Sequence, residues 1–233
     1  MFFELLFIAI VTIGMPTRAW FRYRRGEPPA PAARYISETF LLIGMLSALL
    51  WRRNVPLEAL GLSTNLSWRW LLHLAICLIV IIAPDIWAVW RMERLSQEGT
   101  TLPAPQGLAA DALRGRNAGA AFVAVVIVGA IWEELFFRGT VFAIAAQMPG
   151  GTILGVVAGS LLFGAHHLRN GRSGVMSSTV FGIVFALLFL ITRNLWAVMV
   201  AHAAGNLLTA WQWAPRIERA RRKSLCRTPM FLG

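Results

Sequence analysis

The chain alternates between long apolar segments and shorter polar connections. Seven apolar segments can be recognised, each close to the roughly 17–25 residues that a helix needs to cross a bilayer. They lie at about residues 1–17, 35–51, 70–90, 118–147, 152–168, 174–192 and 195–213. The pattern predicts an all-α polytopic membrane protein with about seven transmembrane helices, because a helix satisfies its own backbone hydrogen bonds in lipid.

Proline, glycine and charge mark the ends of these segments. Pro84 and Asp85 interrupt the third segment, so its helix is expected to kink or end there. The longest polar connection, 91–117, is predicted to be a mobile loop. The tail 214–233 is basic and is predicted to be disordered beyond Arg222.

Composition supports a membrane protein. Hydrophobic residues make up 57% of the 233 residues and charged residues only 14%, whereas a soluble domain is about half apolar and about a quarter charged. The ten Trp and 14 Phe fit the aromatic enrichment found at membrane interfaces.

The net charge of +11 does not indicate nucleic-acid binding, because the basic residues lie in the gaps between apolar segments. With seven spans, seventeen of the 22 Lys and Arg residues fall on one side and four on the other, and Arg138 lies within the fourth segment. Because basic residues accumulate on the cytoplasmic side, the N-terminus is predicted to lie outside and the tail in the cytoplasm. In a prokaryote the membrane would be the plasma (inner) membrane.

Two adjacent glutamates and an arginine interrupt the fourth segment: Glu133, Glu134 and Arg138. Residues four apart share a helical face, so Glu134 and Arg138 are predicted to form an ion pair. Adjacent residues point about 100° apart, which leaves Glu133 to face the bundle interior. An interfacial salt bridge is the simpler alternative. A carboxylate inside a membrane, however, marks a functional site by default, and Glu133 is a candidate general base.

The fifth and seventh segments carry two further polar pairs with four-residue spacing. Phe163 and His167 share one face, while His166 points elsewhere and is expected at the interface. On the seventh segment, His202 and Asn206 share a face and suit an oxyanion-binding pair. Hydrogen bonds that merely join helices are the alternative.

Together these side chains supply a base, a group that orients water and oxyanion donors, which are the parts needed to hydrolyse an amide. Glu133, His167 and His202 also match a divalent-metal set such as a catalytic zinc site. The HExxH motif is absent, Asn206 is a poor zinc ligand, and the two cysteines, Cys77 and Cys226, form no CxxC pair. Metal binding is therefore left open.

The sequence is also compatible with three other interpretations. Residues 171–174 match GxSG, the nucleophile motif of rhomboid-type serine proteases, but Ser173 is expected in a charged loop. A proton-coupled transporter would use Glu133 and the histidines as a proton path, although no internal repeat supports it. A non-catalytic scaffold or immunity protein would leave Glu133 without a function. His73 and Asp85 are expected to be an interfacial residue and a helix-end residue.

The motifs EExxxR, FxxxH and HxxxN, in this order on consecutive segments, resemble the CPBP family of CAAX-protease and bacteriocin-processing proteins, also called the Abi family. The resemblance covers roughly residues 115–212. It implies an intramembrane endopeptidase that cleaves a membrane-associated protein or peptide in the lipid bilayer. The substrate classes it suggests are a prenylated CAAX-type protein, a leader peptide and a C-terminal tail.

The resemblance also implies roles for individual residues. Glu133 and His167 would activate water, His202 and Asn206 would stabilise the oxyanion, and Glu134 and Arg138 would form the supporting ion pair. The family has been described both as glutamate-dependent and as metal-dependent. Three parts are expected: N-terminal helices and a cytoplasmic loop (1–114), a catalytic helical core (115–213) in which the last four helices hold the site, and the basic tail (214–233).

Overall fold

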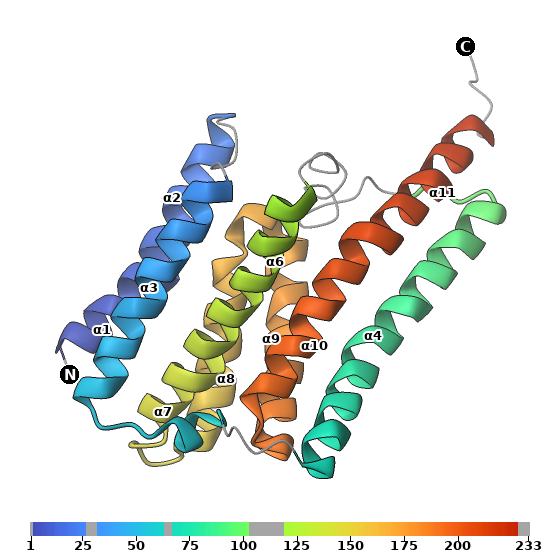
Figure 1. Ribbon diagram of the computed structural model, residues 1–233. Helices are drawn as coiled ribbons and strands as arrows, with labels where there is room; N and C mark the ends of the chain where they lie inside the picture. Colours follow the sequence, from blue (N-terminus) through green and yellow to red (C-terminus); the bar gives the residue numbers. More distant parts are fainter. Residues whose placement is uncertain (1, 27–31, 63–66, 103–118, 228–233) are drawn as a thin grey trace.

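The computed structural model describes residues 2–26, 32–62, 67–102 and 119–227 (Figure 1). Within these residues the chain forms seven continuous helical stretches and no strand, which confirms the predicted all-α fold. The stretches and their parts are α1 (Phe2–Ala9), η1 (Ile10–Gly14) and α2 (Met15–Arg24); α3 (Ala32–Arg52); α4 (Trp68–Gln97); α6 (Gly119–Glu134), η4 (Leu135–Thr140) and α7 (Val141–Ala145); α8 (Gly151–His166); α9 (Gly171–Thr192); and α10 (Leu195–Leu208), η6 (Thr209–Trp213) and α11 (Ala214–Arg227). Two short 3-10 turns, η2 (Leu57–Leu60) and η5 (Leu168–Asn170), lie between helices.

Length and composition make four helical stretches of the described residues apolar enough to cross a membrane. They are Ala32–Arg52, Trp68–Gln97, Gly119–Ala145 and Leu168–Thr192, and Gly151–His166 is a shorter apolar helix. Their outward faces carry exposed apolar side chains such as Ile79, Val157 and Ile191, as expected for helices whose surroundings are hydrocarbon rather than water. The protein is an integral membrane protein.

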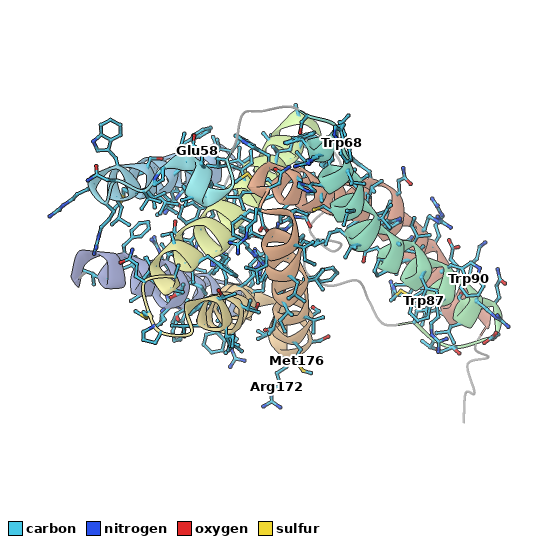
Figure 2. The ribbon with its side chains drawn as sticks, turned by 90° about the horizontal axis from the view of Figure 1, so that it is seen from below. Glu58, Trp68, Trp87, Trp90, Arg172 and Met176 are labelled. Atoms are coloured by element: carbon cyan, nitrogen blue, oxygen red, sulfur yellow. The ribbon has the colours of Figure 1, made fainter. Side chains whose placement is uncertain are left out.

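Tryptophans on α4 mark the two edges of the apolar layer. Trp68 stands at one end of the helix, and Trp87 and Trp90 lie toward the other (Figure 2). All three are more than half exposed. The 19 to 22 residues between them span about 30 Å at about 1.5 Å per residue, close to the thickness of the hydrocarbon core. Interfacial tryptophans typically lie at these two levels.

Several predicted boundaries were wrong. The helix α4 neither ends at Pro84 nor gives way to a loop at residue 91, because it continues to Gln97. Neighbouring helices can supply hydrogen bonds that make proline tolerable inside a membrane helix. The first helix likewise continues to Arg24 rather than ending near residue 17. Residues 103–118, within the predicted mobile loop, lie outside the described residues.

The tail was also predicted incorrectly, because α11 remains helical to Arg227. Its helix lies along the end of α4 (Figure 1). Arg216 donates two hydrogen bonds of 2.8 Å to the Glu93 carboxylate, and Ser96 Oγ donates to the Ala220 carbonyl at 2.7 Å. A packing partner more than 100 residues away therefore orders this basic segment, and local sequence did not reveal it.

The helices that matter for function lie in the middle of the bundle (Figure 1). The α8 and α9 helices pack along each other, α10 lies between α4 and α6, and α3 covers α6. Small residues allow two of these close approaches. A Cβ on Gly182 would lie 2.9 Å from Ser160 Cα, and one on Gly205 would lie 2.9 Å from Ile81 Cγ2.

Candidate active site

A buried ion pair lies where α6 gives way to the π-helical segment η4. Glu134, the last residue of α6, has no exposed side-chain surface, and Arg138 is 1% exposed. Arg138 Nη1 donates to Glu134 Oε1 at 3.0 Å, which bears out the predicted pair. The π-helical turn was not predicted from the sequence, although such turns are frequent at functional sites.

Arg138 also fixes the neighbouring helices. Its Nη2 donates to the Gly182 carbonyl of α9 at 3.1 Å. The guanidinium lies 4.6 Å from the centre of the Phe163 ring and 5.1 Å from that of Phe185. A desolvated cation facing aromatic rings is stabilised by their quadrupoles. One arginine thereby joins η4, α8 and α9 behind the site.

His202 on α10 lies between the two glutamates. Its Nδ1 is 2.7 Å from Glu134 Oε1, and its Nε2 is 3.7 Å from Glu133 Oε2. Since a carboxylate paired with arginine only accepts hydrogen bonds, Nδ1 carries a proton and donates to Glu134. Phe185 stacks on the imidazole with the ring centres 4.6 Å apart. The orientation of His202 is thus fixed, and its Nε2 is the atom directed at Glu133.

His167 is held in a similar way at the end of α8. Its Nδ1 lies 2.9 Å from the Phe163 carbonyl oxygen, which can only accept, so Nδ1 donates and Nε2 stays available. The centre of the Phe163 ring is 4.9 Å from that of His167 and 6.1 Å from that of His202. His166 packs against Phe137, with ring centres 6.0 Å apart and its Nδ1 buried, rather than at the interface.

A cavity of about 350 Å³ brings three of the four predicted catalytic residues together: His167, His202 and Asn206. The fourth, Glu133, does not line it. Glu133 is 14% exposed, and its Oε2 lies 3.7 Å from Nε2 of the cavity-lining His202. Other polar lining residues are Asp85, Asn170, Ser173, Ser177, Ser178 and Thr209, and the apolar ones include Ile81, Phe163, Phe181 and Phe185.

Two features of this site were missed from the sequence. The hydrogen bond from His202 to Glu134 joins residues 68 positions apart, so helical spacing did not reveal it. Asp85, expected at a helix end, instead lies inside α4 and lines the cavity. The available signal was an aspartate within an apolar segment, which by itself marks a functional position.

Ser173 also lines the cavity, from the first turn of α9 rather than from a loop. A serine nucleophile needs a base within hydrogen-bond reach. Among the described residues no hydrogen bond joins Ser173 to a histidine. The geometry therefore does not favour a rhomboid-type serine protease.

A metal site would need several donor side chains arranged around one point. In the part of the chain that the structure describes, no group of three or more His, Cys, Asp or Glu residues is arranged to hold a metal ion. Nδ1 of each site imidazole is engaged, with Glu134 for His202 and with the Phe163 carbonyl for His167, which leaves Nε2 of both rings as the atoms that a metal would use. Glu133, His167 and His202, the metal set that the sequence left open, are therefore not arranged as such a group among the described residues.

Comparison with known families gave a match over part of the chain. Residues 116–208, which include α6 to α10, match the family described as type II CAAX prenyl endopeptidase Rce1-like. The match confirms the resemblance to the CPBP family. Comparison with curated proteins and with solved structures gave no match. The matched region, from α6 to α10, is thus similar to membrane proteases of CAAX-endopeptidase type.

Proposed function

We propose that the protein is an intramembrane endopeptidase that hydrolyses a peptide bond with water activated by Glu133 and His167. The observation that carries the proposal is a cavity inside the helical bundle, lined by His167, His202 and Asn206, with Glu133 Oε2 lying 3.7 Å from His202 Nε2. A separation of this length exceeds a hydrogen bond and suits a bridging water.

Each polar group has a role in the proposed reaction. The Glu133 carboxylate takes a proton from water while the water oxygen bonds to the scissile carbonyl carbon. His167 Nε2 accepts a hydrogen bond that orients this water. Glu133 then passes the proton to the leaving amine as the C–N bond breaks. Asn206 donates a hydrogen bond to the oxyanion as it forms, and His202 donates one from Nε2 when its imidazole is protonated on both nitrogens.

Glu134 and Arg138 position these groups without touching the substrate. Glu134 holds the Nδ1 proton of His202, and Arg138 supplies the counter-charge that keeps Glu134 ionised in a water-poor interior. This resembles the carboxylate partners that fix the orientation of functional histidines elsewhere.

The cavity's position suggests how a substrate enters. Its lining includes Asn170, Ser173 and Gly174, at the turn between α8 and α9. By the distribution of Lys and Arg this turn lies on the cytoplasmic side. A substrate would therefore reach the site from the inner leaflet, with the N-terminus of the protease outside and its tail in the cytoplasm. Prenylated CAAX-type proteins, leader peptides and C-terminal tails all fit this approach.

The test compares the termini of membrane proteins in cells that produce wild type, Glu133→Ala or His167→Ala protein. New termini should appear with the wild type and disappear with both variants. Glu58→Ala and His73→Ala serve as matched controls, because neither residue lines the cavity. Full cleavage by Glu133→Ala or His167→Ala would contradict the mechanism. If Glu133→Gln leaves the cellular phenotype unchanged, the protein acts as a scaffold instead.

A further inference from the structure

Asp85 is a carboxylate in the cavity wall that the proposed reaction does not use. It is half-buried on α4, beside the cavity. None of the described residues forms a hydrogen bond or an ion pair with it. Among the described residues that line the cavity, His167 and His202 are the other ionisable groups, and no lining residue is Lys or Arg.

Nearby arginines do not neutralise this carboxylate. Arg172 adjoins the cavity-lining Ser173 but projects away from the bundle, as does Met176 (Figure 2). Arg138 is fully engaged with Glu134 and Gly182 behind the site. An acidic group in a membrane protein is costly unless something compensates it, so a cation supplied by a ligand would be favoured here.

The depth of Asp85 in the bundle, measured along the helix axes, follows from how α4 is aligned with α10 and α11. These helices run in the same direction (Figure 1). Ile81 meets Gly205, and Ser96 bonds to Ala220. Both pairs are 124 residues apart, so the same offset places Asp85 level with Thr209. Thr209 also lines the cavity and lies seven residues beyond His202. Seven residues correspond to about 10 Å along a helix.

The tryptophans of α4 place this level within the membrane. Asp85 lies two to five residues before Trp87 and Trp90, about 3–8 Å inward from the interface that they mark. His202, by the same offset, is level with Leu78, near the middle of the span from Trp68 to Trp90. The cavity thus reaches from the bundle centre to a carboxylate just below the membrane surface.

We propose that Asp85 forms a subsite that binds a Lys or Arg side chain of the substrate, about three residues from the scissile bond. An extended peptide advances about 3.3 Å per residue, so three residues cover the 10 Å between His202 and Asp85. The proposal rests on the proposed proteolysis, and it names the substrate class: a membrane-associated segment with a basic residue close to the membrane surface.

The test uses the full-length protein in liposomes and a neutral membrane-anchored peptide with a single Lys at successive positions. Two matched series carry Gln or Glu at the same positions. Mass spectrometry gives the cleaved bond and kcat/KM. The Lys-to-Gln ratio of kcat/KM should peak at about tenfold with Lys about three residues from the bond, as expected for a charge-assisted hydrogen bond.

Variants separate a subsite from a structural effect. Asp85→Asn should reduce the ratio to about one, and Asp85→Lys should reverse the preference toward Glu, which a merely structural role would not do. The control Glu58→Gln removes an exposed carboxylate on η2, remote from the cavity lining, and should keep the peak. The proposal is overturned if the Lys-to-Gln ratio of kcat/KM shows no peak with the wild-type protein. It is also overturned if the peak remains in Asp85→Asn.

A second measurement keeps the subsite distinct from the proteolysis. Full-length Glu133→Gln protein is photo-crosslinked to the Lys and Gln peptides, so that binding is read without cleavage. Preferential capture of the Lys peptide that depends on Asp85 supports the subsite, and equal capture overturns it. If the wild-type protein cleaves none of the peptides, the proposed function is refuted, whereas the subsite is judged by the crosslinking.

Discussion

The substitution Glu134→Gln tests whether the buried ion pair organises the site. It keeps the shape of the side chain but leaves the Arg138 cation, 1% exposed, without its counter-charge. Removing one partner of a buried pair typically costs about 3–5 kcal/mol. The bonds from Arg138 to Gly182 and to the aromatic rings exist in both proteins, so they do not offset the loss.

In a membrane, the free-energy cost of breaking a buried ion pair is smaller, because the polar groups of a chain unfolded in the membrane also find partners. We therefore expect Glu134→Gln to lower the free energy of unfolding by about 3 kcal/mol, at the lower end of that range. The assay is reversible unfolding by sodium dodecyl sulfate in mixed micelles, followed by tryptophan fluorescence.

A matched control is Glu38→Gln. Glu38 also pairs with an arginine four residues away, Arg34, but both side chains are about half exposed (48% and 47%). An exposed pair contributes about 0–1 kcal/mol. If Glu134→Gln lowers the free energy of unfolding no more than Glu38→Gln does, the buried pair does not stabilise the bundle and the reasoning is refuted.

The double substitution Glu134→Leu with Arg138→Met separates stability from catalysis. Replacing a buried ion pair with apolar side chains of similar volume is often neutral or stabilising by about 1–4 kcal/mol. The double variant should therefore recover most of the stability that Glu134→Gln loses. It should remain inactive, because His202 Nδ1 has then lost its acceptor. An active double variant would show that Glu134 does not position His202.

Three further substitutions address separate parts of the site. Asn206→Ala removes a proposed oxyanion donor and should lower kcat by about 100- to 1,000-fold with a smaller change in KM; an unchanged kcat would exclude that role. Ser173→Ala should retain most of the activity in the same peptide assay, whereas complete loss would restore the serine-protease interpretation. Gly182→Ala places a Cβ 2.9 Å from Ser160 Cα and should destabilise the protein by about 1–3 kcal/mol through overpacking. The Gly44→Ala control has no atom within 4 Å of the added Cβ, and its unfolding free energy should change little; equal effects would exclude a tight α8–α9 contact.

Features set by a single helix were predictable from the sequence. The pairing of Glu134 with Arg138 follows from four-residue spacing, and it is present at 3.0 Å. The placement of His202 and Asn206 on one face follows in the same way, and both line the cavity. The apolar segments gave the number of helices because the length of a membrane span is set by the bilayer itself.

Features set by two helices were not predictable, because they depend on the register between segments that the sequence separates. Glu134 was assigned only to Arg138, yet its Oε1 also accepts the proton of His202, 68 residues away. Asp85 was assigned to a helix end, yet α4 continues past it because α10 and α11 pack along α4 to Ser96 and beyond. The same register that extends the helix also brings Asp85 level with Thr209 and into the cavity. The extension of α4 and the acidic cavity wall are therefore two consequences of one helix contact, and that contact lies partly outside the residues that match the protease family.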